Sequence, residues 1–246
     1  MNEGLIAYSP GVTSGLTPEP HPQVHPPLHT GTPAEVDTRQ VKRAEMPVGA
    51  PFVVAAIVII QLALPETVSV GPRWAIPALE VVGAVILAMV LALSDLTGRA
   101  RRLVVSVYLT MLIASSVLNG LLLFDSLLTT QAVPESGEEL LLAGFGVLII
   151  NVLSFGLVYW ELDGGGPAGR ELGLHEPDFQ FPQQASGMAW HPTLFDYLFT
   201  AYTNIIAFSP TDTMPLTHRV KFLFVIQSTV SLVTVLVTLS RAINLL

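Results

Sequence analysis

The sequence contains no cysteine and few charged residues. The lack of cysteine excludes disulfide bonds, thiolate metal sites and catalysis by a thiol nucleophile. Asp, Glu, Lys and Arg together make up 12% of the chain, whereas about 25% is usual for a soluble domain. Clusters of basic residues that would bind nucleic acid are missing as well. The composition therefore offers neither a thiol-based enzyme nor a nucleic-acid-binding surface.

Long apolar runs take the place of these charges: 51% of the residues are hydrophobic, and the mean hydropathy is +0.60. Because hydrocarbon offers the backbone no hydrogen-bonding partners, a segment that crosses a bilayer must be a helix of about 20 mostly apolar residues. Buried helices of a soluble protein would show polar stripes, which these runs largely lack. Segments of the required kind are Met46–Leu64, Trp74–Leu93, Leu103–Phe124, Leu140–Trp160 and Val220–Leu239. The sequence therefore predicts an all-α, multi-pass protein of the cell's inner (plasma) membrane, surrounded by lipid, with about five transmembrane helices.

Residues 1–45 precede these runs and are rich in proline, glycine, threonine and histidine. They have too little apolar surface to offset the entropy of ordering, so we expect a disordered tail. His21, His25 and His29 recur every four residues, which would suit metal binding on a helix, but the intervening prolines prevent that helix. We therefore expect neither a metal nor a cofactor. The tail also lacks the apolar region of a signal peptide.

The rest of the chain is predicted to have three parts. Residues 46–125 hold three transmembrane helices, residues 126–139 form an acidic loop, and residues 140–246 open with a helix over 140–160. A polar loop over 163–192 leads to an apolar and aromatic segment over 193–208, which is too short to cross a bilayer comfortably and suits a re-entrant helix. A turn over 209–217 with two prolines precedes a final helix over 220–245.

The turn after this short segment carries the most informative motif. Residues 207–212 read Ala-Phe-Ser-Pro-Thr-Asp, and Pro215 and Thr217 follow. In potassium channels the filter Thr-x-Gly-Tyr-Gly is followed by Asp, two further residues and Pro. Residues 140–246 thus resemble the pore module of the tetrameric pore-loop cation channels, in which a pore helix and a filter loop lie between an outer and an inner helix. The wider layout, with Tyr-Trp-Glu-Leu-Asp at 159–163, also resembles a group of uncharacterised bacterial integral membrane proteins.

The resemblance implies a tetramer in which the filter-like residues surround a central axis and contact inorganic ions. These residues are Ala207, Phe208, Ser209, Pro210, Thr211 and Asp212. They lack the glycines on which a cage of backbone carbonyls depends, and Pro210 restricts Ser209 before it. We therefore expect no potassium selectivity. Two alternatives remain: a pore lined by the hydroxyls and carboxylate of this turn, or a pore-like fold that conducts nothing.

The final helix carries one continuous polar face made of Gln227, Ser231, Thr234 and Thr238, at spacings of 4, 3 and 4 residues. In a pore module this face lines the conduit. The alternative is that these side chains hydrogen-bond to neighbouring helices, which is the ordinary use of such residues in membranes. The sequence leaves both open.

The distribution of basic residues predicts the orientation. With a cytoplasmic N-terminus, nine of the eleven basic residues lie inside: Arg39, Lys42, Arg43, Arg99, Arg101, Arg102, Arg170, Arg219 and Lys221. This orientation conflicts with the resemblance, because a potassium-channel pore loop enters from outside. Either the loop is inverted, or the charge rule misleads, or residues 193–208 cross as a sixth helix.

Isolated polar residues add little. Glu80 lies near the start of its helix, where it could reach the interface, pair with Arg73 or serve a function. Asn119 and Asn151 are interpreted as contacts between helices, and Glu161 and Asp163 as anchors at the membrane interface. The sequence shows no group of residues suited to acid–base catalysis or metal binding, so we do not expect the protein to be an enzyme. The sequence predicts an ion-channel-like protein with a degenerate pore loop, with a non-conducting scaffold or accessory subunit as the alternative.

Overall fold

The computed structural model describes residues 49–65, 72–93, 98–128, 137–171, 173–188, 190–207 and 212–245. The tail over residues 1–45 and the centre of the acidic loop, both named above, lie outside these residues. The described elements, in chain order, are α2 (Ala50–Ala63), α3 (Ala75–Leu93), α4 (Gly98–Leu128), α5 (Gly137–Leu162), the 3₁₀ turn η2 (Asp163–Gly165), α6 (Pro167–Glu171), β1 (Phe179–Gln180), α7 (Pro182–Ala185), α8 (Leu194–Ile206), β2 (Met214–Pro215) and α9 (His218–Leu245). The predicted all-α fold is confirmed, apart from the pair of two-residue strands.

Three helices are long and apolar enough to cross a membrane. They cover Ala100–Asp125 of α4, Gly137–Arg170 along α5 and its extension, and His218–Ser240 of α9. Their outward faces are apolar, as Val107 on α4, Phe145 on α5 and Leu236 on α9 are each more than half exposed. A surface of this kind suits lipid rather than water.

The first two predicted spans correspond to shorter apolar helices. α2 has 14 residues, which is about 21 Å of helix, against a hydrocarbon core of about 30 Å. It begins with a proline in its first turn and ends at Leu64, whose backbone is extended. Because Pro65 disfavours the helical conformation of the residue before it, the helix stops there. α3 has 19 residues.

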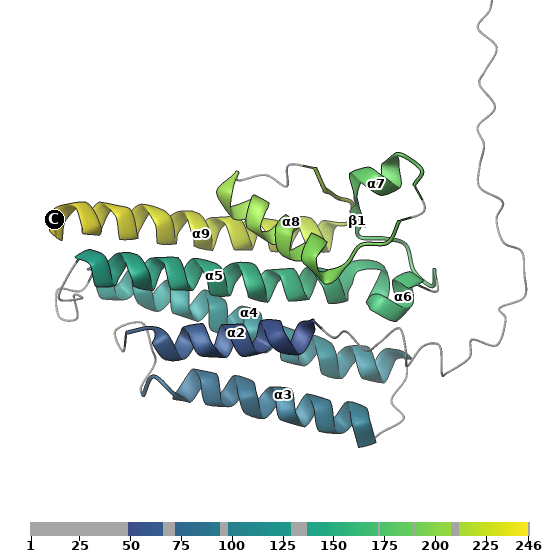
Figure 1. Cartoon of the computed structure of the whole chain (residues 1–246), viewed down its shortest axis with the longest axis horizontal. Helices are drawn as coiled ribbons and strands as arrows, with labels where there is room; N and C mark the ends of the chain where they lie inside the picture. The colour runs from purple at the N-terminus through teal and green to yellow at the C-terminus, as the bar shows by residue number, and fades with distance from the viewer. Residues whose placement is uncertain are drawn as a thin grey trace, which may run out of the picture. The chain divides into compact units, whose positions relative to one another are not determined.

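The helices form a bundle around α5, with successive long helices running in opposite directions (Figure 1). α5 contacts α2, α4, α8 and α9, and glycines on its surface allow close approach. A Cβ atom at Gly144 would lie 2.6 Å from Thr238 Cγ2 of α9, and one at Gly156 would lie 2.6 Å from Leu198 Cδ2 of α8. These distances are shorter than side-chain contacts permit, so glycine is needed at both positions.

Two buried clusters hold the bundle together. An aliphatic cluster joins α2, α4 and α5, with Ile57, Leu112 and Ile150 almost fully buried. An aromatic cluster joins the end of α5, β1 and the beginnings of α8 and α9. Its members are Phe155, Tyr159, Trp160, Phe179, Phe181, Tyr197, Ala201, Val220 and Phe224. The second cluster fixes the part of the chain in which the sequence placed the pore-like segment.

Candidate functional site

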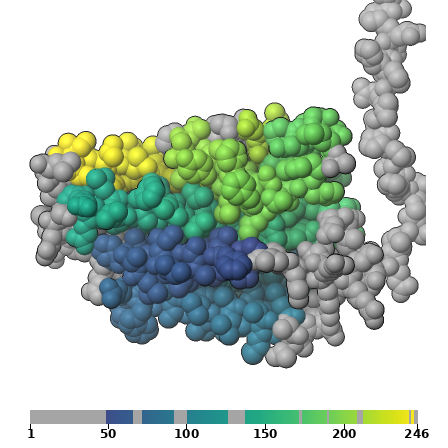
Figure 2. Space-filling model, in the orientation of Figure 1, coloured from purple at the N-terminus to yellow at the C-terminus, as the bar shows by residue number. Residues whose placement is uncertain are grey.

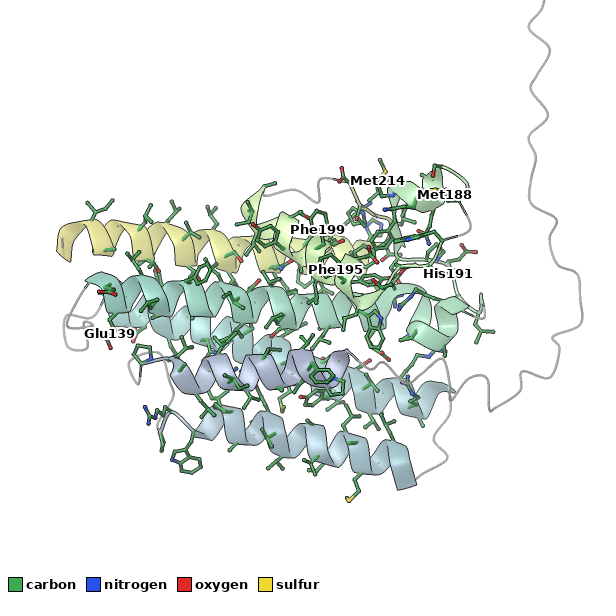
Figure 3. The ribbon with its side chains drawn as sticks, in the orientation of Figure 1. Glu139, Met188, His191, Phe195, Phe199 and Met214 are labelled. Atoms are coloured by element: carbon green, nitrogen blue, oxygen red, sulfur yellow. The ribbon has the colours of Figure 1, made fainter. Side chains whose placement is uncertain are left out.

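α8 starts at one end of the bundle and runs inward along α5 and α9 (Figure 1). Figure 2 shows the outer surface of this region. We call this the hairpin end; it holds β1, β2 and α7, and Figure 3 shows Met188 and Met214 there and Glu139 at the opposite end. α8 opens with a capping box in which the Asp196 carboxylate accepts hydrogen bonds from the Thr193 amide and hydroxyl, both at 2.7 Å. Asp196 therefore caps the helix.

α8 has two different faces. Tyr197, Thr200, Ala201 and Asn204 are buried against the bundle. The opposite face carries Phe195, Phe199, Tyr202 and Ile206, at spacings of 4, 3 and 4 residues, and each is about half exposed or more. Figure 3 shows Phe195 and Phe199 on this outer face. The helix is thus anchored on its polar and small residues and presents an aromatic stripe outward.

After α8 the chain returns to the hairpin end. Thr213 and Thr200 lie within hydrogen-bonding distance, with their hydroxyl oxygens 3.2 Å apart. β2 then pairs antiparallel with β1, Pro215 opposite Phe179, and the Leu216 amide donates to the Asp178 carbonyl at 2.8 Å. α8 has 13 residues, about 20 Å of helix. Because α8 is short, and Thr193 before it and β2 after it both lie at the hairpin end, α8 does not cross the bundle as a sixth helix. We call α8 and the return to β2 the hairpin.

The inner face of the hairpin is fixed by Gln227 of α9. Its side-chain oxygen accepts hydrogen bonds from the Tyr159 hydroxyl at 2.7 Å and the Asn204 amide at 2.8 Å. Its side-chain nitrogen donates to the Ala201 carbonyl at 3.0 Å. One buried amide therefore joins α5, α8 and α9 with its hydrogen-bonding capacity largely filled.

The outer end of the hairpin is fixed by two buried aspartates. Asp163, directly after α5, accepts hydrogen bonds from the Asp178 amide at 2.7 Å, the Phe179 amide at 3.2 Å and the Tyr197 hydroxyl of α8. The Tyr197 side chain is fully buried, so water does not compete for this hydrogen bond. Asp163 thus connects α5, β1 and α8.

Asp178 is fully buried and connects β1 to the start of α9. Its carboxylate accepts from the Thr217 hydroxyl at 2.6 Å, from Arg219 Nε at 2.7 Å and from Arg219 Nη2. The fork of two bonds from one guanidinium fixes the carboxylate in orientation as well as in position. We call Asp163, Asp178, Tyr197 and Arg219 the hairpin anchor.

An open cleft of about 450 Å³ lies beside this anchor. Arg101, at the start of α4, forms an ion pair of 3.3 Å with Glu161 at its wall. The lining side chains combine both signs of charge, and they come from α4, the end of α5, the polar loop and the start of α9. They are Arg102, Ser106, Glu161, Leu162, Gly165, His175, Glu176, Asp178, Thr217 and Arg219.

No protein-family model, curated protein or solved structure matches the chain. Among the described residues, no group of three or more His, Asp or Glu side chains is placed to hold a metal ion.

The predicted filter-like residues fall partly within the described chain. Ala207 is exposed and caps the end of α8, and Asp212 is exposed on the return. Phe208, Ser209, Pro210 and Thr211 lie outside the described residues. Of the six filter-like residues, the structure thus describes Ala207 and Asp212, and Asp212 is the charged one.

The predicted inner-helix face is buried within the chain. Gln227, Ser231, Thr234 and Thr238 are each at most 5% exposed. Gln227 bonds to α5 and α8, Thr234 donates to the Val230 carbonyl at 2.8 Å, and Thr238 lies against Gly144. This arrangement favours contact between helices, the second of the two alternatives, over the lining of a conduit.

Three interpretations of polar residues change. Glu161 and Asp163, interpreted as interface anchors, have partners within the chain, because Glu161 pairs with Arg101 and Asp163 binds the hairpin. Glu80 is buried deep between helices, with Gln61 and Ser115 as partners rather than Arg73. Asp178 was not among the residues predicted from the sequence. An aspartate between proline and phenylalanine, in a loop that returns to the bundle, was the available signal for a buried carboxylate.

Proposed function

We propose that the chain is a multi-pass membrane protein in which α5, the hairpin and α9 form a pore-loop-like module, and that several copies assemble around this module to form an ion pathway without potassium selectivity. One observation carries the proposal. A short amphipathic helix enters the bundle and the chain returns to the same end, between two long apolar helices. This order of elements is the one expected of a re-entrant pore loop.

Five crossings fit the apolar surfaces of the bundle. In addition to the three long helices, α2 and α3 carry exposed apolar side chains such as Phe52, Ile59 and Val85. A span shorter than the hydrocarbon core is accommodated by local thinning of the bilayer. The hairpin would then lie within the thickness of the membrane, which is tolerated because non-helical backbone there is covered by protein.

Assembly follows from the outer face of α8. In the described part of the chain, the stripe of Phe195, Phe199, Tyr202 and Ile206 is 47% to 73% exposed. A single hairpin cannot enclose an axis, so a conduit requires copies of the same chain around it, and a tetramer is the closed arrangement that we propose. The stripe would pack against the neighbouring copy, where aromatic side chains contribute most to an interface.

The ion preference would come from side chains. Asp212 is exposed on the return of the hairpin, and symmetric copies would place a ring of negative charge at the mouth of the pathway. Such a ring concentrates cations without dehydrating them, so it distinguishes cations from anions better than potassium from sodium.

A non-conducting subunit is the second candidate, and the polar face of α9 favours it. Gln227, Ser231, Thr234 and Thr238 are used within the chain, so the exposed face of α9 is apolar, with Phe222, Val225 and Leu236. Around a shared axis, this face would provide an apolar lining, and an apolar constriction blocks ions by dewetting.

Two measurements on the full-length protein test the proposal. Native mass spectrometry in mild detergent should give a tetramer. Planar-bilayer recordings with potassium, sodium and chloride substituted in turn should give a cation current with little preference between potassium and sodium. A monomer would contradict the module, a tetramer without current would favour the non-conducting subunit, and strict potassium selectivity would contradict the role given to the side chains.

A further inference from the structure

A carboxyl group lies inside the bundle at a distance from the hairpin module. Glu80 of α3 is 1% exposed, and its partners Gln61 of α2 and Ser115 of α4 are 3% and 8% exposed. Glu80 Oε1 accepts a hydrogen bond from Ser115 Oγ at 2.6 Å and one from Gln61 Nε2 at 2.9 Å. Gln61 Nε2 and Ser115 Oγ are also 3.2 Å apart. Three helices therefore converge on one carboxyl oxygen.

The other carboxyl oxygen has no such partners. Among the described residues, Glu80 Oε2 is buried without a hydrogen bond, and so are Gln61 Oε1 and the hydroxyl of Tyr108. The Tyr108 ring lies against α3, with its Cδ2 atom 3.2 Å from where a Cβ of Gly83 would stand. Buried polar atoms without partners are rare in proteins, and each one in a native structure calls for an explanation such as an unseen ion or a functional role.

The described positive charges nearest to the site along its helices are Arg73, which is exposed just before α3, and the arginines at the start of α4. α2 contains no charged residue, and Glu80 is the only one in α3. The charged residues of α4 stand in its first and last turns, as Arg99, Arg101, Arg102 and Asp125. At 1.5 Å per residue, Ser115 lies about 20 Å from Arg102 and about 15 Å from Asp125 along the helix. Tyr108 is the titratable neighbour that α4 places against α3.

We propose that Glu80, held by Gln61 and Ser115, is an exchangeable proton-binding site within the bundle. A proton that binds Oε2 converts the carboxylate to a carboxylic acid, with no other reactant. The bound proton removes a negative charge that the apolar surroundings solvate poorly, and it turns Oε2 from an acceptor into a donor.

A purely structural role would not require an ionisable group. The side-chain oxygen of a glutamine could accept the same two hydrogen bonds from Gln61 and Ser115 without the cost of a buried charge. Intramembrane carboxyls of this kind are costly and mark proton or ion pathways. The site lies on α2, α3 and α4, so it stands whether or not the hairpin module conducts.

Infrared difference spectroscopy of the full-length protein tests the site. On acidification all 19 acidic side chains can contribute protonated-carboxyl bands, so the band to follow is the one at the high-frequency edge of that region, where a carboxyl group in apolar surroundings absorbs. The wild type should gain this band, and it should shift in D₂O. Glu80→Gln should lose the band, since it keeps the size and the acceptor oxygen but cannot ionise. Glu161→Gln is the matched control, because Glu161 is buried as well but is paired with Arg101, and its variant should keep the band.

Labelling with dicyclohexylcarbodiimide gives an independent measurement on the wild type. The reagent adds the protonated carboxyl across its carbon–nitrogen double bond, so the adduct should map to Glu80 by peptide mass spectrometry and decline as the pH rises. Replacing choline chloride by sodium chloride at constant ionic strength should leave the yield unchanged. A band that persists in Glu80→Gln, an adduct yield that does not depend on pH, or protection by sodium would each overturn the assignment of an exchangeable proton.

Discussion

At the scale of single residues, the buried carboxylates of the hairpin end differ from the exposed one. Asp163 and Asp178 are at most 2% exposed and accept several hydrogen bonds each. Asp212 is exposed on the same hairpin. A buried carboxylate whose oxygens accept several hydrogen bonds stabilises the fold, whereas an exposed carboxylate attracts cations from solution. Substitutions at the two kinds of site should therefore have different effects.

Tyr197→Phe tests the buried side of this division. The variant removes the phenol that donates to Asp163 and leaves one carboxylate oxygen without that donor. We expect a loss of about 1–3 kcal/mol in stability and a lower melting temperature in detergent. Tyr202→Phe is the matched control, because this tyrosine lies on the same helix and is 50% exposed. Equal melting temperatures for both variants would contradict the anchor.

Asp212→Asn tests the exposed side. The change removes one negative charge per chain with little change in volume, so cation conductance in planar bilayers should fall. The reduction should be largest at low salt, because screening there is weakest. Glu176→Gln, which removes an exposed charge in the cleft at the same end, should change the conductance less. Unchanged conductance in Asp212→Asn, with the oligomer intact, would remove Asp212 from the ion pathway.

At the scale of elements, glycines decide how closely the hairpin approaches α5. A Cβ at Gly156 would lie 3.0 Å from the Leu198 Cα atom and closer still to its side chain. Backbone cannot move aside as a flexible side chain can, so α8 can occupy its position only where α5 carries no side chain. At Gly144 the close atoms belong to the short, branched side chain of Thr238 on α9, the nearest at 2.6 Å.

Gly156→Val should therefore displace α8. Overpacking of this kind costs about 1–3 kcal/mol, and we expect a lower melting temperature and loss of the oligomer, whose proposed interface includes the outer face of α8. Ala55→Val on the exposed face of α2 is the control that places the same side chain on an apolar helix surface. A tetramer of normal stability in Gly156→Val would contradict the close contact of α5 and α8.

The sequence predicted the helices better than their contacts. The length of the apolar segments located the helices, because a backbone that crosses hydrocarbon must be helical. The segment over residues 193–208 was expected not to cross because it is shorter than a membrane span. The helical spacing of its polar residues identified the polar face of α9. Spacing alone does not show whether such a face lines a central pore or packs against a neighbouring helix. Gln227 illustrates this, since its partners Tyr159 and Asn204 lie far away in sequence. Glu80 was placed near an interface because its partners on α2 and α4 are equally remote.

At the scale of the whole molecule, basic residues gather at one end of the bundle. Arg101 meets the end of α5 at Glu161, and Arg102 and Arg219 line the same cleft at the hairpin end. Arg73 precedes α3, which begins at the opposite end (Figure 1). The charge rule then places the hairpin end in the cytoplasm, whereas the pore loop of a potassium channel enters from outside. The resemblance and the charges thus require opposite orientations.

Single cysteines decide between these orientations, and the chain is suited to them because it contains no cysteine of its own. Met188 at the hairpin end is 56% exposed, and Glu138 at the start of α5 is also exposed. With a membrane-impermeant maleimide added to intact cells, Glu138→Cys should be labelled and Met188→Cys should react only after the membrane is opened. This result follows from the basic residues, whose transfer across the membrane is disfavoured. Both variants should react fully in detergent, which controls for burial. Labelling of Met188→Cys alone in intact cells would show that the hairpin enters from outside, as in potassium channels, and that the charge rule fails for this chain.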